Sequence, residues 1–266
     1  MIESFFGFSS MPFEKGIPVE DLFVTPSFDE ALSRLTYTAE NQLFSIFTAA
    51  VGAGKTTTLR KFSTLLDPSK FQFFYVSDSQ LTPRWFYKNL LEQLGVAPKY
   101  YRNEARLQLQ KELHLLNSLH NKRAVTVIDE AHLLDHEMME EIRFLLNFQM
   151  DSVNPMALIL VGQNELLDRL KRTSYEAIRQ RIDLKCSLPP LDRSQISGYI
   201  SSHLKAVGFD GPLFTDSAVD LIFRSASGSL RLINKLCANC LIFAAQRNQK
   251  LIDDHMTSQV IQGEML

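Results

Sequence analysis

Residues 51–59 read VGAGKTTTL, and residues 124–134 read AVTVIDEAHLL. The first stretch is a glycine-rich turn that ends in Lys-Thr, between an apolar run and a helix-like segment. The second is an apolar, β-branched strand pattern that delivers Asp129 and Glu130 at its end. Together the two stretches predict the two halves of a site for nucleotide phosphates, and either alone would be much weaker evidence.

Around these stretches, apolar runs of strand length alternate with longer helix-patterned segments. This alternation is typical of a parallel sheet with crossover helices, and nearly continuous apolar runs suit strands buried on both faces. The predicted strands are 43–49, 72–77, 124–129, 156–162 and 183–188. The predicted helices among them are 27–39, 55–66, 82–94, 103–120, 137–149 and 164–172.

The pattern changes at Pro189-Pro190, because two successive prolines break a regular element. All later segments are helix-patterned: 192–207, 215–226, 229–247 and 253–263. The sequence therefore predicts an α/β fold, a three-layer sandwich with a central parallel sheet, followed by a small helical lid. We expect residues 1–188 to form the nucleotide-binding base, with residues 1–26 as an N-terminal strap, and residues 189–266 to form the lid.

The bulk composition limits the possible partners. A net charge of −2 means that a nucleic-acid surface must be a local patch. No apolar run reaches about 18 residues, and the N-terminus lacks a signal-peptide pattern, so we expect a cytoplasmic protein without a membrane span. Cys237 and Cys240 form a CxxC inside an apolar helical pattern without further ligands nearby, which favours a buried pair over a metal site.

The glycine-rich turn is expected to hold ATP and Mg²⁺. Gly52 and Gly54 let backbone N–H groups turn toward phosphate oxygens, and the following helix adds its positive N-terminal end. Lys55 would reach the β- and γ-phosphates, and Thr56 would ligate Mg²⁺. Ala49 stands where the strict pattern has its first glycine, which matters only if that position needs a positive φ or close packing. The predicted nucleotide-binding residues of the turn are Val51, Gly52, Ala53, Gly54, Lys55, Thr56 and Thr57.

Acidic and polar residues at two further strand ends extend the site. Asp129 would bind Mg²⁺, usually through water, and Glu130 would polarise the attacking water; the alternative is a solvated acid after a strand. Gln163 would bond the attacking water or the γ-phosphate, or else cap the helix that follows it. In EAIRQRIDL (176–184), an arginine either reaches into a neighbouring subunit's site or ends a solvated helix, and Arg181 is a better candidate than Arg179.

The ordered set GAGKTT, VIDEAH, LVGQNEL, QRI and GSLRLINKL resembles the AAA+ ATPases. Within them the chain looks most like the ExeA-like and transposition-helper branch, with its MuB-, TnsC-, TniB- and IstB-like members. The resemblance implies that Gln163 is sensor 1, that Arg181 acts in trans, and that Arg231 in Gly228-Ser229-Leu230-Arg231 is sensor 2. The resemblance also implies that Pro12 and Phe13 border the adenine, although a strap packed on the core would show the same pattern.

The sequence departs from that branch at three positions. Asn164 replaces a common proline, and Leu230 replaces the proline before sensor 2; both look harmless. Ala49 raises a question about nucleotide affinity, while Lys55 and Glu130 are intact. We therefore expect slow hydrolysis in a nucleotide-dependent switch.

Two classes of function fit the resemblance. In the first, the protein is a regulator of DNA transposition that forms a homo-oligomeric ring or filament on double-stranded DNA with ATP. It would recruit a transposase, with or without a target-selection protein, and disassemble on hydrolysis. In the second, it is an ExeA-like ATPase for assembly of a secretion or envelope complex. ExeA-like proteins carry a membrane span and a cell-wall-binding domain beyond the ATPase region. This sequence ends after its lid, so we expect the role in transposition. A scaffold in phage or plasmid maintenance is a third option.

For contact with DNA, the segment PKYYRNEAR (98–106) offers Lys99, Arg102 and Arg106 among aromatic residues. A solvated loop is the alternative. Arg84 and Trp85 form a second candidate patch.

Overall fold

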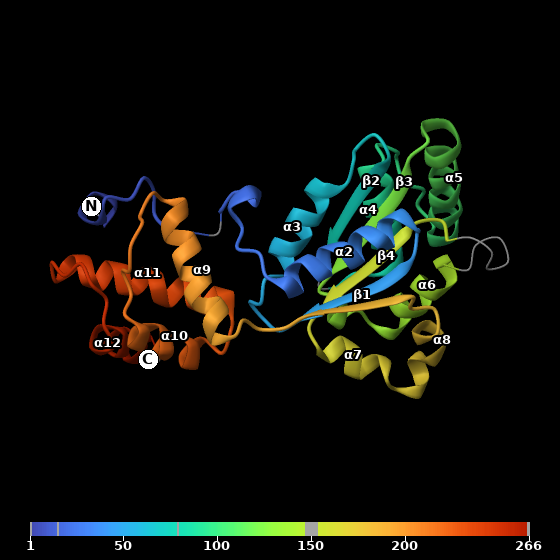
Figure 1. The fold of residues 1–266 in the computed structure, drawn as a ribbon. Helices are drawn as coiled ribbons and strands as arrows, with labels where there is room; N and C mark the ends of the chain where they lie inside the picture. The colour runs from blue at the N-terminus through green and yellow to red at the C-terminus, as the bar shows by residue number, and fades with distance from the viewer. Residues whose placement is uncertain (1, 15, 79, 147–153, 265–266) are drawn as a thin grey trace. The chain divides into compact units, whose positions relative to one another are not determined.

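The computed structural model describes residues 2–14, 16–78, 80–146 and 154–264. The chain forms two compact units. Residues 29–49 and 55–188 make up one, here called the sheet unit, and residues 1–28, 50–54 and 189–266 make up the other, here called the helical unit (Figure 1).

The sheet unit contains five parallel strands in the order β2-β3-β4-β1-β5. These are β1 (Phe44–Ala49), β2 (Phe71–Ser77), β3 (Arg123–Asp129), β4 (Ala157–Gly162) and β5 (Leu184–Leu188). All five predicted strands and the parallel sheet are confirmed. Because every neighbouring pair is parallel, the carboxyl ends of β3, β4 and β1 lie side by side at one edge of the sheet.

Helices cover both faces of this sheet, as the near-continuous apolar strands require. Alternate strand residues, such as Ile46, Ile128 and Leu160, belong to one core that also holds buried residues of the helices between β2 and β5. Their strand neighbours Val127 and Ile159 are equally buried on the other face, where the ring of Phe62 from α3 contacts β2. The covering helices are α2 (Pro26–Glu40), α3 (Lys55–Leu65), α4 (Pro83–Gln93), α5 (Arg102–His120), α6 (His136–Leu146), α7 (Glu165–Leu170) and α8 (Glu176–Arg179).

The predicted helices of the sheet unit match these bounds within three residues. The last residues of the predicted helix 137–149 lie outside the described residues. Short elements were not predicted: α8 and the 3₁₀ turns η2 (Ala131–Leu133) and η4 (Thr173–Tyr175). A single turn carries too few residues for a periodic apolar pattern.

The helical unit packs four long helices around a second core: α9 (Arg193–Ala206), α10 (Asp216–Ala226), α11 (Leu230–Gln246) and α12 (Asp254–Glu264). Asp192 and Gln195 cap the start of α9 reciprocally, which explains why the helix begins directly after the two prolines. All four predicted helices are present.

The N-terminal segment belongs to this second core. After α1 (Ile2–Phe6), the rings of Phe6, Phe8 and Phe13 pack among the long helices, and η1 (Val19–Asp21) follows. The strap therefore packs on the helices after Pro190. The predicted domain boundary, with a base of residues 1–188 and a lid of 189–266, stays a prediction.

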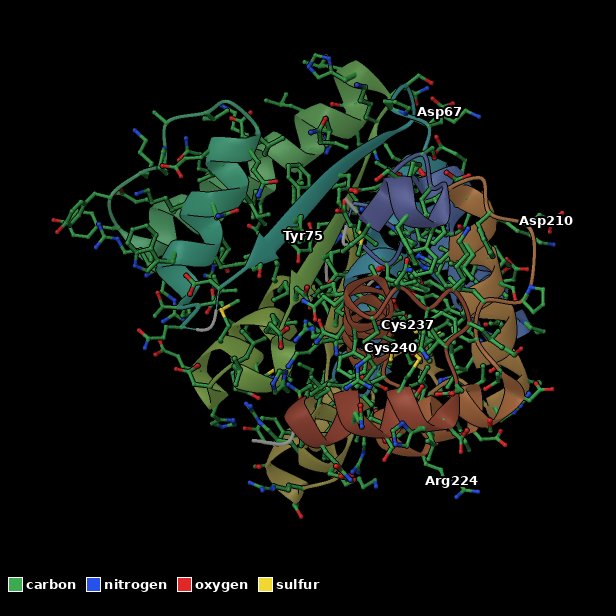
Figure 2. The ribbon with its side chains drawn as sticks, turned by 90° about the vertical axis from the view of Figure 1, so that its left-hand side faces the viewer. Asp67, Tyr75, Asp210, Arg224, Cys237 and Cys240 are labelled. Carbon is green, nitrogen blue, oxygen red and sulfur yellow. The ribbon has the colours of Figure 1, made fainter. Side chains whose placement is uncertain are left out.

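Cys237 and Cys240 lie one turn apart on α11 and are fully buried (Figure 2). Burial raises the pKa of the Cys240 thiol to about 11, so it stays protonated at neutral pH.

Candidate nucleotide site

The glycine-rich turn joins β1 to α3. Gly52 and Gly54 have φ angles of 74° and 104°, a left-handed conformation that favours glycine. Lys55 is the first residue of α3, so the positive end of this helix opens onto the turn. The Lys55 side chain is buried, and its Nζ donates a hydrogen bond of 3.2 Å to the carbonyl of Ala49. Thr56 is exposed at the same helix start. This is the expected arrangement of an anion site.

Ala49 is the last residue of β1, where it pairs with Leu188 of β5 and is fully buried. A strand residue has a negative φ that any L-residue adopts, so the methyl group causes no backbone strain here. The departure at Ala49 therefore leaves the turn's geometry intact.

Asp129 ends β3 and is buried, with both carboxylate oxygens hydrogen-bonded. The hydroxyl of Tyr75 donates to Oδ2 at 2.6 Å, and the Glu130 amide donates to Oδ1 at 2.8 Å. Burial and the Asp129 carboxylate together raise the pKa of Tyr75 to about 12, so the phenol stays a donor. The two hydrogen bonds thus fix the orientation of the Asp129 carboxyl group.

The sequence interpretation missed Tyr75, which Figure 2 labels on β2. The pairing of β2 with β3 would have indicated this contact between Tyr75 and Asp129. Ser77 lies opposite Asp129, and Tyr75 lies two residues before Ser77, on the same face of the sheet. The pairing register itself could not be read from the sequence.

Glu130 follows Asp129 at φ 53° and ψ 31°, a left-handed conformation that is uncommon for a residue other than glycine. Its side chain is 41% exposed, and one carboxylate oxygen lies 3.5 Å from Nδ1 of His132. The contact does not meet hydrogen-bond geometry, since Nδ1 has no hydrogen-bond partner among the described residues. Glu130 is therefore accessible to water, as a general base must be.

Gln163 follows β4, the strand between the Asp129 strand and the strand that leads into the turn. Gly162 pairs with Thr48 of β1 one residue before the turn begins. A Cβ at Gly162 would lie 3.1 Å from the amide of His132, so a small residue is needed before Gln163. Asn164, not Gln163, is the N-cap residue of α7, and its side chain makes no capping hydrogen bond. The sheet order thus places Gln163 at the end of the strand that neighbours β3, the strand that Asp129 ends.

Arg179, one of the two candidate arginines, makes hydrogen bonds within its own chain. It donates to the carbonyls of Leu170 and Lys171 at the end of α7, at 3.4 and 3.0 Å. Arg181 follows α8 and is partly exposed. Both arginines are partly exposed, and the role of either one at a neighbouring subunit's site stays a prediction.

Arg231 lies in the first turn of α11 and is exposed, and its amide donates to the carbonyl of Gly52 at 3.3 Å. A Cβ at Gly52 would come within 2.4 Å of the Ser229 hydroxyl. Gly228, at φ 76°, allows a similarly close approach, since a Cβ there would lie 2.6 Å from Pro190. Gly52 lets the start of α11 lie against the phosphate turn, and Gly228 lets the chain before α11 lie against Pro190 and Leu191, both within the helical unit.

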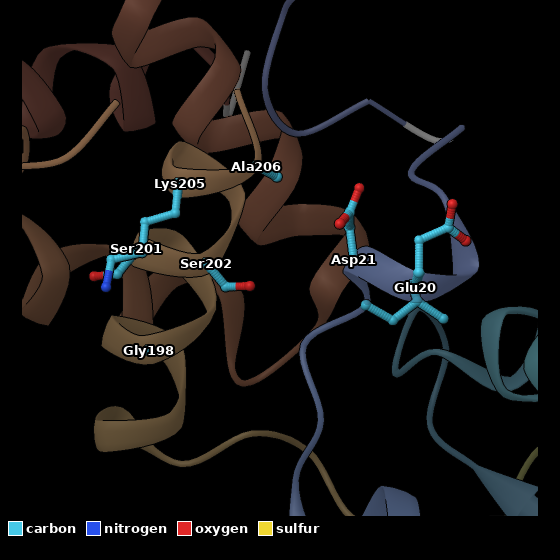
Figure 3. Close-up of a pocket in the computed structure, with 8 residues that line it drawn as sticks. Glu20, Asp21, Gly198, Ser201, Ser202, Lys205 and Ala206 are labelled. Atoms are coloured by element: carbon cyan, nitrogen blue, oxygen red, sulfur yellow. The ribbon is translucent and has the colours of Figure 1, made fainter. Parts of the chain in front are cut away.

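Pro12 and Phe13 are buried. The Phe13 ring stacks on His203 of α9 with centroids 5.2 Å apart. The Phe13 ring thus contacts protein, and its contact with adenine stays a prediction. The same unit has an open pocket between η1 and α9, bordered by Glu20, Asp21 and Lys205 (Figure 3). Residues of the phosphate turn do not line this pocket.

The predicted DNA contacts separate into different environments. Arg102 forms ion pairs with Glu137 and with the buried Glu141 of α6. Arg106 has a buried Nε without a hydrogen-bond partner among the described residues. Lys99 is exposed. Two of the three candidates therefore take part in the packing of α5, and their contact with DNA stays a prediction.

An exposed cluster lies close by, here called the aromatic–basic patch: Arg84, Trp85, Lys88, Tyr100 and Tyr101. Arg84 lies 4.3 Å from the centroid of the Tyr100 ring, and Lys88 lies 4.3 Å from that of Trp85. The three aromatic side chains are more than half exposed.

The side chains that could bind Mg²⁺ at this site are too few to hold the ion without a nucleotide. Among the described residues, no group of three or more histidine, cysteine or acidic side chains could hold a metal ion alone. Thr56 supplies one hydroxyl and Asp129 one carboxylate, so phosphate oxygens and water would complete the six ligands that Mg²⁺ requires.

A family model described as an AAA domain matches residues 38–170 of the chain. The chain belongs to this AAA family. The chain is an AAA+ ATPase domain, since it combines this family match with the parallel sheet, the glycine-rich turn and the acidic pair Asp129–Glu130.

Among curated relatives, General secretion pathway protein A of Aeromonas hydrophila is 31% identical over 257 residues, which cover 95% of this chain and 46% of the relative. The chain thus spans about half the length of that relative.

Solved structures share the fold at low sequence identity. The crystal structure of Cdc6p from Pyrobaculum aerophilum matches with a TM-score of 0.70 and 18% identity, covering 94% of this chain and 68% of that one. Drosophila ORC bound to DNA matches with a TM-score of 0.68 and 17% identity, covering 97% and 70%. The helices of the described residues are all too short or too polar to cross a membrane.

Proposed function

We propose that this chain is the ATP-hydrolysing switch of a secretion pathway, of the kind for which General secretion pathway protein A is named. The observation that carries the proposal is the 31% identity to that protein over 95% of this chain. The sequence had favoured regulation of transposition, and this relative favours the secretion alternative instead.

In the proposed reaction, Lys55 and the backbone of the turn bind the β- and γ-phosphates at the positive end of α3. Thr56 and Asp129 would hold Mg²⁺, which would neutralise charge on the phosphates. Glu130 orients the attacking water and accepts its proton. The exposed carboxylate of Glu130 and the fixed carboxylate of Asp129 support this division of roles.

Three further residues respond to the γ-phosphate in this proposal. Gln163 bonds the water or the γ-phosphate, because it lies at the strand between Asp129 and the turn. Arg231 lies at the helix start that meets Gly52. Arg181 completes the site of a neighbouring copy, which makes a homo-oligomer the working form. An interface that includes the γ-phosphate is stable with ATP and weaker with ADP.

A domain exchange tests the secretion proposal. This chain replaces the matching region of the Aeromonas relative in cells that lack it, and secretion is measured. We expect the wild-type exchange to restore secretion and the Lys55→Ala exchange, matched in expression, to leave it absent. If neither exchange restores secretion although the purified chain hydrolyses ATP, the secretion role is rejected and the assignment as an ATPase stands.

The aromatic–basic patch favours a second candidate, an ATPase that assembles on DNA. Cations next to exposed rings suit phosphates and stacked bases. A transposase, with or without a target-selection protein, would then be the partner, and only the sequence resemblance supports that partner. DNA binding by the purified chain, measured with and without a non-hydrolysable ATP analogue at two salt concentrations, tests this candidate. Salt-sensitive binding that depends on the analogue would support it, and no binding at low salt would reject it.

A further inference from the structure

The turn after β3 is connected to the segment that carries Arg181 through one side chain of α7. The guanidinium of Arg169 donates from Nη1 to the carbonyl of His132, at 3.0 Å, and from Nε to the hydroxyl of Tyr175, at 3.1 Å. It also lies 5.1 Å from the centroid of the Tyr175 ring. His132 belongs to η2, directly after Glu130, and Tyr175 ends η4, directly before α8.

The η2 end of this connection is closely packed. Gly162 at the end of β4 approaches His132 so closely that a Cβ would lie 3.1 Å from its amide and 3.2 Å from the Leu166 side chain of α7. The carbonyl of Glu130 also accepts a hydrogen bond from the Leu133 amide, at 2.9 Å. A change in the backbone of Glu130, which starts from the disfavoured φ of 53°, therefore moves the His132 carbonyl as well.

The other end leads to Arg181 within six residues. Tyr175 is buried, and its ring also packs edge-on against His136 at the start of α6. Arg179 binds the end of α7 through two carbonyls, and the amide of Arg181 donates to the carbonyl of Ile178 at 3.0 Å. The segment 173–181 is thus bound to α7 at both of its ends.

An arginine fits this connection better than any other residue. Its Nε and Nη1 lie in one rigid plane, so the two acceptors are held at a fixed separation. A hydrogen bond weakens steeply when the acceptor moves out of line, so the two acceptors must move together or one bond breaks. Lysine keeps the charge but has no planar pair of donors.

We propose that Arg169 is a positioning residue that couples the conformation of the Glu130 turn to the position of the Arg181 segment. ATP bound by one copy would then determine how that copy presents Arg181 to the next. The inference rests on the proposed ATP site, and it assigns to Arg169 no contact with nucleotide.

Hydrogen exchange of the full chain, with Mg²⁺ and with or without adenylyl-imidodiphosphate, tests the coupling. In the wild type we expect the nucleotide to change exchange both in 50–57 and in 173–181. In Arg169→Lys we expect the same change in 50–57 and at least a threefold smaller change in 173–181. Arg172→Lys makes the same substitution at a nearby exposed arginine and should behave as the wild type.

Kinetics provide a second readout. Arg169→Lys should lower kcat of the assembled protein at least fivefold and leave the KM for ATP unchanged. Should Arg169→Lys not fold, Tyr175→Phe removes only the accepting hydroxyl and should give the same pattern. A normal response of 173–181 in the folded variant would overturn the coupling, as would a wild type in which 50–57 responds and 173–181 does not. No response of 50–57 in the wild type would overturn the ATP site itself, and the inference with it.

Discussion

His203 gives the helical unit a defined sensitivity to acid. It is 4% exposed on α9 and lies between two rings, stacked on Phe13 and 4.4 Å from the centroid of Tyr199. Burial lowers the pKa of His203 from 6.5 to about 4, because the charged imidazolium would lose its hydration there. At neutral pH the residue is therefore neutral in both the folded and the unfolded chain.

The sign and size of the effect follow from this shift. Above pH 6.5 neither state binds the proton, so His203 costs no stability. As the pH falls from 6.5 toward 4, only the unfolded chain takes up the proton, and the free energy of unfolding decreases. A shift of this size at about 1.4 kcal/mol per pKa unit corresponds to a loss of about 3 kcal/mol at pH 4.

His203→Phe keeps an aromatic ring between Phe13 and Tyr199 and removes the titration. Urea unfolding at pH 7.5, 6, 5 and 4 measures the free energy of unfolding of both proteins. Far-ultraviolet circular dichroism follows the loss of all helices. Trp85, the only tryptophan, lies on α4 and reports the sheet unit separately. We expect the difference in the free energy of unfolding between the wild type and the variant to change by about 3 kcal/mol across this range. The variant should be the relatively more stable protein in acid.

The exposed His255 of α12 provides the control, since His255→Gln should follow the wild type. Carboxyl groups also titrate below pH 6, and they do so equally in both proteins. A difference between His203→Phe and the wild type that stays constant from pH 7.5 to 4 would show that the buried imidazole does not carry the acid sensitivity.

Three further changes test the site. Glu130→Gln should lower ATP hydrolysis by about 100-fold or more, because the amide cannot accept a proton, and leave the Kd for ATP unchanged; normal turnover would remove Glu130 as the base. Tyr75→Phe should lower the free energy of unfolding by about 1–3 kcal/mol, the cost of a lost hydrogen bond to a charged group, while Tyr37→Phe at an exposed site should be neutral in the same urea titration. Gly52→Ala should weaken ATP binding by about tenfold, because residue 52 has a left-handed φ and because the new methyl group would meet the Ser229 hydroxyl. Adding Ser229→Ala should recover only the part of the affinity that the contact with Ser229 costs. Full recovery would show that the φ of residue 52 is unimportant.

The sequence predicted what local patterns determine. The five strands match within about one residue because strands buried on both faces are apolar throughout, and the proline pair marks the change to helices. The order of the strands was not predicted, and it is this order that places the ends of β3 and β4, and with them Asp129 and Gln163, side by side at one edge of the sheet.

What the sequence could not predict depends on partners far along the chain. Tyr75 and Asp129 are 54 residues apart, and their contact depends on the register of β2 and β3. Arg102 looked like a free cation in a basic, aromatic segment, but the carboxylates that pair with it lie 35 and 39 residues later on α6. Arg169 was an ordinary arginine in a helical pattern until η2 and η4 placed two acceptors on either side of it.

The two ends of the glycine-rich turn have different requirements, which explains the departure at Ala49. Ala49 completes a strand, so it needs neither a positive φ nor the absence of a side chain, and its carbonyl serves as the resting partner of Lys55. Gly52 needs both, because its φ is 74° and the start of α11 lies where a Cβ would be. The geometry of the turn therefore requires glycine at position 52 and not at position 49. In this chain β1 extends through Ala49, so the methyl group at that position is accommodated without strain.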